Sequence, residues 1–302
     1  MSPALTSQYF ENGDIRLHYM SGGDRHAPLM VFLHGFPEFW IAWEPVFSAF
    51  AQDYHLVAPD QRGFNLSSKP SSAADYDTKH MVADLLALID NLSPNQPIIL
   101  CGHDWGASVA YAFAMRHGVR VEKLIIANGV HPMCFQKALF AGGAQNKGSQ
   151  YMNRLREPGM AEIMSANGYK KMFGMLEGFS PTPWLTDDIR ARYLEAWSQP
   201  GALEAMLNWY RASPMIVPPI DAVPKEMIFD DSQRRKYRIA MPHLLIWGMD
   251  DPALLPEARA DLHEFCDDLQ VVEIAGADHW IIHSHGERVA AEMQKFLTAQ
   301  SN

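Results

Sequence analysis

Short apolar runs that alternate with helical segments constrain the fold of this chain more than any other feature of its sequence. Three of these runs are continuous: 29–33 (LMVFL), 98–101 (IILC) and 244–247 (LLIW). Such runs suit strands buried on both faces, whereas the apolar and polar alternation at 15–19 suits a half-exposed strand. Helical patterns at 79–92, 107–117 and 286–297 separate or follow the strands. This order predicts an α/β fold with a mostly parallel central sheet, right-handed crossovers and helices on both faces.

The alternation stops after the strand predicted at 124–127 and resumes only at 242–246. The stretch between them is rich in Met, Trp and Tyr, and proline-containing sequences interrupt it at 180–183 (SPTP) and 217–219 (VPP). We predict that this stretch forms short helices inserted after the sixth strand. They would lie over the carboxyl ends of the strands, where α/β folds bind ligands.

The interruption predicts two domains. Residues 1–131 and 239–302 form the expected core domain, and residues 132–238 form a helical cap, or lid, domain. The early cap is strongly apolar through nine residues: Met133, Phe135, Met152, Met160, Met164, Met172, Phe173, Met175 and Phe179. At helical spacing such residues more often belong to a core than to a pocket, but their number favours a small hydrophobic substrate.

Charge and cysteine usage exclude several classes of function. The 302 residues carry a formal net charge of -10, which opposes nucleic-acid binding because that needs clustered Lys and Arg. Cys101, Cys134 and Cys266 lie far apart without metal-ligand spacing, so we expect no disulfide framework. The sequence shows neither a signal-peptide pattern nor an apolar stretch of membrane length, which predicts a cytoplasmic protein with no membrane partner. The oligomeric state stays open, with a homodimer among the alternatives.

Asp104 occupies the centre of GHDWG (102–106), between a predicted buried strand and a predicted helix. This strand, sharp turn and helix form the elbow on which many hydrolases expose a nucleophile, which is Ser in esterases and lipases. A carboxylate is already ionised at neutral pH, and its attack on an sp3 carbon gives an alkyl ester that water can cleave. An Asp at such a place is most often only a helix N-cap, so the assignment depends on its companions.

His279 and Asp251 are the predicted companions of Asp104. His279 lies in GADHW (276–280), after the strand predicted at 271–274, and would act as the general base. Asp251 follows the buried strand that ends near Trp247 and would orient the imidazole, with Asp250 as its immediate competitor. The other place in the chain for this acid, after 124–127, holds Asn128.

HGFP (34–37) ends the strand at 29–33, where this kind of architecture has its second oxyanion donor. The amides of Phe36 and Trp105 are the expected donors, and Phe36, Pro37 and Trp105 are expected to border the substrate. The Phe36-Pro37 bond is a candidate cis peptide.

With these elements in order, the chain resembles the epoxide hydrolases of the α/β-hydrolase superfamily over nearly its whole length. The stretches that carry the resemblance are HGFPEFW (34–40), APDQRGFNLSSKP (58–70), GHDWG (102–106), NWYR (208–211), WGMDD (247–251) and DHW (278–280). The resemblance implies two cap tyrosines that hold the epoxide oxygen. Tyr210 matches one, and Tyr151, which precedes REPG, is similar to the other, with Tyr169 and Tyr193 as alternatives.

The resemblance further implies a reaction. A small hydrophobic epoxide would bind under the cap, Tyr151 and Tyr210 would hold its oxygen, and Asp104 would open the ring. His279, with Asp251, would then activate water to release a vicinal diol, and no metal or organic cofactor would be needed.

Three other functions compete with this one. A haloalkane dehalogenase uses the same ester chemistry with indole donors, for which Trp105 and a cap Trp such as Trp184 are candidates. A fluoroacetate dehalogenase would need arginines where this chain has Trp105 and Ser108. A non-catalytic receptor of the same fold commonly loses part of the triad, whereas here every element is present.

Overall fold

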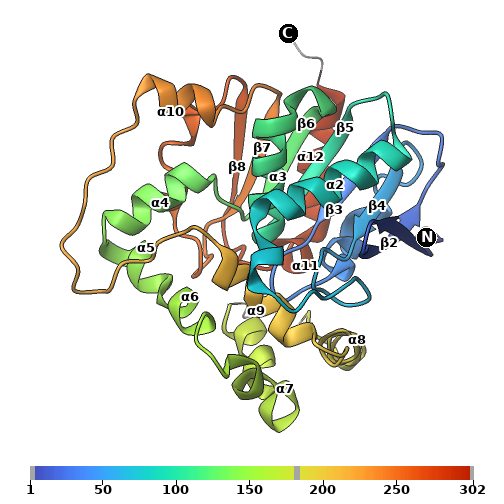
Figure 1. Cartoon of the computed structure of the whole chain (residues 1–302). Coiled ribbons are helices and arrows are strands. Elements are labelled where there is room, and N and C mark those ends of the chain that lie inside the picture. Colours follow the sequence, from blue (N-terminus) through green and yellow to red (C-terminus); the bar gives the residue numbers. More distant parts are fainter. Residues whose placement is uncertain (1–3, 180–183, 300–302) are drawn as a thin grey trace.

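A computed structural model describes residues 4–179 and 184–299 of the chain. At its centre lies an eight-stranded sheet with the order β1-β2-β4-β3-β5-β6-β7-β8 (Figure 1). The strands are β1 (Thr6–Asn12), β2 (Ile15–Gly22), β3 (Leu29–Leu33), β4 (His55–Pro59), β5 (Ile98–His103), β6 (Val121–Ala127), β7 (His243–Gly248) and β8 (Leu269–Ile274). Only the pairs β1 with β2 and β2 with β4 are antiparallel. The predicted α/β fold is confirmed.

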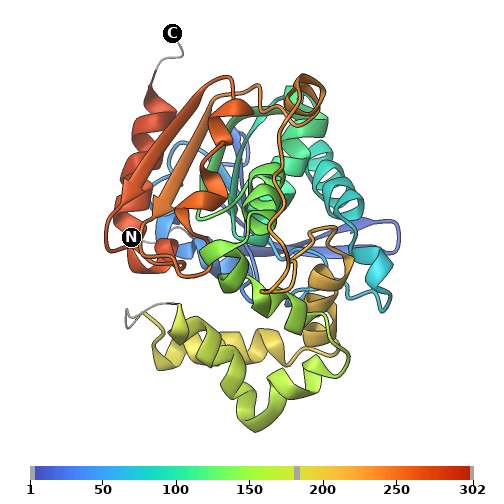
Figure 2. The ribbon, with the colours of Figure 1, turned by 90° about the vertical axis from the view of Figure 1, so that its left-hand side faces the viewer.

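The continuous apolar runs are explained by burial on both faces of the sheet. In β3, Leu29, Val31 and Leu33 belong to one apolar cluster, and Met30 and Phe32 belong to the other. Helices cover both faces (Figure 2): α2 (Thr78–Leu92) and α3 (Trp105–His117) lie on one side. The other side is covered by α1 (Glu44–Phe47), α11 (Ile281–Ser284) and α12 (Gly286–Thr298).

Two strands, β1 and β4, have no counterpart among the predicted ones. The side chains of β1 are mostly exposed because it is an edge strand, so it carries no burial pattern. β4 is fully buried but is only HLVAP, a short run bounded by His55 and Pro59. Neither an exposed edge strand nor so short a run gives a clear apolar pattern, so the sequence did not predict these two strands.

Seven helices stand between β6 and β7 among the described residues. They are α4 (Pro132–Phe140), α5 (Gly143–Gly148), α6 (Gln150–Leu155), α7 (Met160–Gly178), α8 (Asp187–Trp197), α9 (Ala202–Ala212) and α10 (Asp231–Lys236). The backbone of α7 leaves helical geometry at residues 166–169. The SPTP sequence at 180–183 lies outside the described residues. Figure 2 shows α6 to α9 as a layer beyond one end of the sheet, while α10 lies beside the core.

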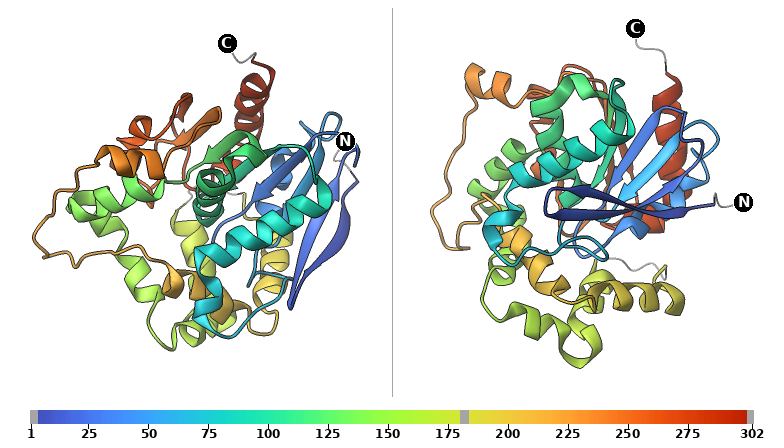
Figure 3. Two further views of the ribbon diagram at one scale, coloured as in Figure 1. Left: turned by 45° about the horizontal axis from the view of Figure 1, so that its top comes forward. Right: turned by 45° about the vertical axis from the view of Figure 1, so that its right-hand side comes forward.

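The segment from α9 to α10 runs along the outside of α4 and α5 (Figure 3). Amide side chains hold its backbone. Gln136 both donates to the Ile216 carbonyl (2.8 Å) and accepts from the Ile216 amide (2.9 Å), and Asn146 donates to the Pro218 carbonyl (3.0 Å). Side-chain amides therefore supply the partners that this irregular backbone lacks.

Cys101, Cys134 and Cys266 are all free thiols. None of the described helices combines the length and the apolar character that crossing a bilayer demands.

His243, at the start of β7, is a buried histidine in its neutral form. Its Nδ1 donates to the Leu124 carbonyl (3.2 Å), and the Tyr111 hydroxyl donates to its Nε2 (2.9 Å). Burial lowers the pKa of His243 to about 4. Because this pKa lies below the unfolded value of about 6.5, the unfolded state takes up the proton first as the pH falls.

We expect His243 to make the protein less stable in mild acid. Its contribution is complete above pH 6.5 and is lost between pH 6.5 and 4, by roughly 3 kcal/mol. Urea unfolding at pH 7.5 and 4.5 should show a smaller loss in His243→Gln than in the wild type. His26→Gln, at an exposed loop position, is the control and should lose as much as the wild type. Equal losses in all three proteins would contradict the assignment.

Candidate active site

Asp104 lies in the turn between β5 and α3 in a strained conformation, with φ of 50° and ψ of -120°. The surrounding glycines make the turn possible. A Cβ at Gly106 would lie 2.2 Å from the Leu33 carbonyl oxygen, and one at Gly35 would lie 2.2 Å from Asp104 Oδ1. The Asp104 side chain makes no capping hydrogen bond to α3, so a simple N-cap does not describe it.

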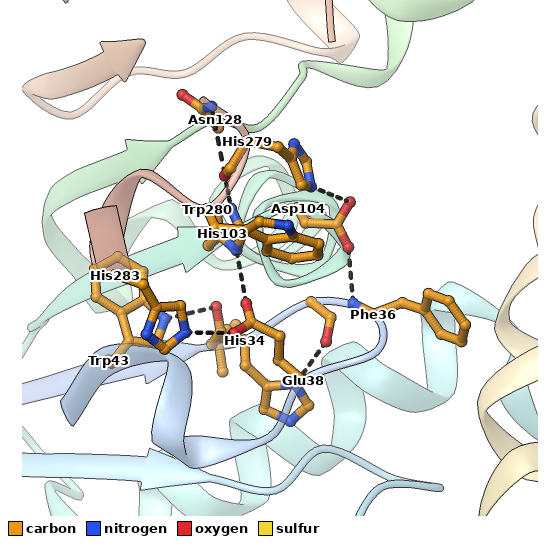
Figure 4. A network of polar contacts seen from close by, with 12 residues as sticks. His34, Phe36, Glu38, Trp43, His103, Asp104, Asn128, His279, Trp280 and His283 are labelled. Carbon is orange, nitrogen blue, oxygen red and sulfur yellow. Dashed lines mark hydrogen bonds and ion pairs between the residues drawn. The ribbon is translucent and has the colours of Figure 1, made fainter. Parts of the chain in front are cut away.

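Instead, the Asp104 carboxylate faces a backbone amide and an imidazole (Figure 4). The Phe36 amide donates to Oδ1 (2.8 Å), and His279 Nε2 lies 3.6 Å from Oδ2. His279 Nδ1 lies 2.8 Å from Asp251 Oδ2. Asp251 is buried and accepts the amides of residues 253 and 254 (2.7 and 2.9 Å), whereas Asp250 is exposed. The structure thus brings the predicted trio together and gives the imidazole contact to Asp251.

Asn128 supports this arrangement, a role that sequence analysis missed. Its Nδ2 donates to Asp251 Oδ2 (2.9 Å) and to the Asp278 carbonyl (2.8 Å), and its Oδ1 accepts the Gly248 amide (2.7 Å). Asn128 has a φ of 36°, a left-handed conformation that Asn tolerates better than most residues. One side chain therefore joins the turn that carries the acid to the turn that carries the imidazole.

Tyr151, on α6, and Tyr210, on α9, line the same cavity as Asp104. Burial raises the pKa of both hydroxyls, which keeps them protonated at neutral pH. The Tyr210 ring packs edge-on against Phe36 and Trp105, each with 5.1 Å between centroids.

The two alternative tyrosines point elsewhere. Tyr169 donates to the Trp197 carbonyl (3.2 Å), and Tyr193 donates to Glu38 Oε1 (2.6 Å). Neither lines the cavity that holds Tyr151 and Tyr210.

This cavity has a volume of about 550 Å³, and Trp105, Met133, Phe135 and Met152 are among its lining residues. Met164, Met172 and Phe173 of the apolar cap set are buried in the core instead.

Phe36 and Pro37 are not among the residues that line this cavity, and their predicted place beside the substrate stays a prediction. The Phe36 ring packs behind Tyr210, and the Pro37 carbonyl accepts the indole N–H of Trp197 (2.7 Å). The Phe36-Pro37 bond is cis, as predicted. Trp184, the candidate halide donor, stacks on His283 with 4.2 Å between ring centroids and is likewise outside the lining.

A second buried polar group lies behind the imidazole (Figure 4). Glu38 Oε1 lies 2.7 Å from His283 Nε2, and its Oε2 lies 3.4 Å from His103 Nδ1. His103 Nε2 in turn donates to the backbone carbonyl of His279 (2.8 Å). Burial alone would raise the pKa of Glu38, but His283 and His103 hold it well below its usual range. Glu38 also accepts the hydroxyl of Tyr193, which lies on α8. Through Glu38 and His103, α8 is therefore linked to the backbone of His279.

Comparison with known proteins agrees with this geometry. Residues 28–286 match the α/β-hydrolase fold family. The chain belongs to that family. It is 34% identical to the AB hydrolase superfamily protein YfhM of Bacillus subtilis, over 97% of this chain and 98% of that protein.

Similarity to proteins named epoxide hydrolases also covers nearly all of this α/β-hydrolase, which confirms the resemblance. Epoxide hydrolase 2 of Caenorhabditis elegans is 31% identical over 95% of this chain and 79% of that protein. A structure of a novel epoxide hydrolase from metagenomes of hot environments gives a TM-score of 0.87 at 33% identity, covering 99% of this chain and 100% of that one. The Bacillus megaterium epoxide hydrolase in complex with an inhibitor gives 0.86 at 30% identity, covering 97% and 100%.

The charge on His279 depends on both carboxylates of this α/β-hydrolase. Burial by itself lowers the pKa of the imidazole, but Asp251 and the nearby Asp104 outweigh it and raise the pKa to about 10. The resting site therefore holds a protonated imidazole between two carboxylates. Loss of the negative charge on Asp104 removes one of the two groups that stabilise this proton.

We expect Asp104→Asn, which removes that charge with little change in shape, to lower the pKa of His279 by roughly 1–3 pH units. NMR titration of the His279 imidazole would measure it. Asp250→Asn is the matched control, since Asp250 is exposed and does not contact the imidazole. An unchanged pKa in Asp104→Asn would show that Asp251 alone sets the charge on His279.

Proposed function

We propose that this chain is an epoxide hydrolase that converts a small hydrophobic epoxide and water into a vicinal diol. The observation that carries the proposal is the pairing of Asp104 and its His279 and Asp251 contacts with Tyr151 and Tyr210 in one cavity. A carboxylate nucleophile suits an sp3 carbon, and two protonated phenols suit an oxygen that gains negative charge.

In the first step, Asp104 Oδ2 attacks an epoxide carbon and the ring C–O bond breaks. The Phe36 amide holds Oδ1, so the opposite oxygen is free to form the new bond. Tyr151 or Tyr210 donates a proton to the departing alkoxide, which is the stronger base. The product is a hydroxyalkyl ester of Asp104.

After the first step, the resting proton of His279 passes by way of solvent to the tyrosinate, which restores the tyrosine hydroxyl and leaves a neutral imidazole. In the second step, water adds to the ester carbonyl carbon and this imidazole takes its proton. Negative charge develops on Oδ1, where the Phe36 amide already donates and where the Trp105 amide is the second proposed donor. Collapse of this intermediate breaks the bond to the diol oxygen, which takes up the proton of the added hydroxyl through His279, and so restores the Asp104 carboxylate beside the imidazolium. Asp251 stabilises the imidazolium that forms on His279, as the acid of a triad does.

Placement of the polar groups supports two domains with separate duties. We assign residues 1–131 and 239–302 to a core that holds nucleophile, base and acid. Residues 132–238 form a cap that supplies Tyr151 and Tyr210. The free thiols of Cys101 and Cys134, both buried, support the proposed cytoplasmic location.

A single turnover in 18O-labelled water should place the label in the Asp104 carboxylate, because water attacks the ester carbonyl carbon and the diol keeps the original Asp104 oxygen. Peptide mass analysis would locate the label. His279→Gln should accumulate the ester and leave Asp104 unlabelled. Label in the diol alone, with none in Asp104 after turnover by the wild type, would rule out the covalent route.

Replacing Tyr210 or Tyr151 by Phe should lower kcat/KM for epoxides by roughly 100-fold, the usual effect of losing a general acid. Tyr169→Phe is the matched control, since that hydroxyl bonds the Trp197 carbonyl away from the cavity. Halide release from a matched haloalkane, measured beside diol formation, tests the dehalogenase alternative. Rapid halide release that survives both Tyr substitutions would favour that alternative.

A further inference from the structure

We propose that the end of the cavity remote from Asp104 binds an anionic group through Arg116 and Lys236. The preferred substrates would then be amphipathic epoxides with an apolar spacer and an anionic end, such as a carboxylate. This inference rests on the proposed epoxide hydrolase function and specifies the class of substrate.

The cavity follows one face of α3. Five of its lining residues recur at helical spacing along that helix: Trp105, Ser108, Ala112, Met115 and Arg116. From Trp105, next to the nucleophile, to Arg116 the helix rises by about 16 Å. One continuous space therefore connects the reactive carboxylate with the last turn of α3.

The wall between the two ends is apolar. Besides the α3 residues, the apolar side chains of Met133, Phe135, Met152 and Leu254 line the cavity. Such a wall favours a hydrocarbon spacer over a polar one, because an unpartnered polar group would lose its hydration there.

The remote end carries two positive charges. Arg116 Nη1 donates to the Ala112 carbonyl (3.2 Å), which holds the guanidinium along the face of α3 that borders the cavity. Lys236 ends α10, with its Nζ 5.1 Å from the centre of the Tyr237 ring, which also lines the cavity. Figures 1 and 2 both show α10 beside the later turns of α3. Within residues 4–179 and 184–299, no carboxylate lies within 4.0 Å of either cation.

Apart from Asp104, the cavity lining includes one other carboxylate, Asp77. Asp77 accepts the Lys79 amide (3.1 Å) and lies 3.9 Å from Lys79 Nζ, at the start of α2. Its charge is therefore partly balanced outside the cavity.

The net charge of the whole protein is opposite in sign to the charge at the remote end of the cavity. With a formal net charge of -10, the protein repels anions at long range. Arg116 and Lys236 have no carboxylate partner among the described residues. At the remote end of the cavity their positive charges would offset this repulsion for a bound anion. Both side chains are exposed, so each contact is expected to change affinity by only two- to fivefold.

Steady-state kinetics on straight-chain acids with a terminal epoxide, and on their methyl esters, would test the inference. The series should bracket the span of about 16 Å along α3. We expect the acid of matching length to be preferred over its ester by about tenfold in kcat/KM at low salt, and by less at high salt. Arg116→Gln and Lys236→Gln should each reduce this ratio two- to fivefold, and the double variant should abolish it.

Lys171→Gln, which removes an exposed cation of α7 outside the cavity, is the matched control and should keep the ratio. Styrene oxide, which is short and neutral, should be hydrolysed equally by all variants. Equal rates on acid and ester, or variants that lose thermal stability without changing the ratio, would overturn the inference and leave the epoxide hydrolase function intact. Failure to hydrolyse any epoxide, styrene oxide included, would instead refute the proposed function and the inference with it.

Discussion

The active site depends on the close approach of two turns, one after β3 and one after β5. Gly35 and Gly106 stand where any larger residue would collide with the opposite turn, at 2.2 Å in both cases. Their lack of a side chain allows the Phe36 amide to reach the Asp104 carboxylate, and it allows α3 to start directly behind the nucleophile. The strain at Asp104 is maintained because both strands are fully buried in the centre of the sheet.

Burial of charge is the second constraint, since a carboxylate without partners would not stay ionised in this interior. Each buried acid near His279 has several donors. Asp251 receives two backbone amides and the Asn128 amide, and Glu38 lies against two histidines and a tyrosine hydroxyl. These bonds tie the last turns of the core to one another and to α8, so the imidazole has one well-defined position.

Sequence patterns predicted the strands and helices whose apolar residues recur regularly. They also predicted the residues whose side chains can act as nucleophile or base. Asp104, His279 and the buried strands were recognisable because each stands in a fixed order along the chain. Asn128 was not assigned a role, because an amide that bridges two turns leaves no pattern in the sequence. Asp251 and Asp250 are adjacent, and only the direction of each side chain separates them. The sequence likewise does not show which way Phe36 and Pro37 face: the Phe36 amide donates to Asp104, whereas the Pro37 carbonyl accepts the Trp197 indole outside the cavity lining.

The charges of the site change in an order that suits two opposite tasks. Before reaction, Asp104 and Asp251 together hold a proton on His279, and the Asp104 carboxylate is the group that attacks. Formation of the ester consumes the charge on Asp104, so a group that favoured the imidazolium becomes neutral. The pKa of His279 then falls, so the imidazolium can release its proton to the tyrosinate that ring opening leaves, and the neutral imidazole can take a proton from water when a base is needed. In this scheme the first chemical step itself prepares the base for the second, while Asn128 and two backbone amides hold the Asp251 carboxylate in place against the imidazole.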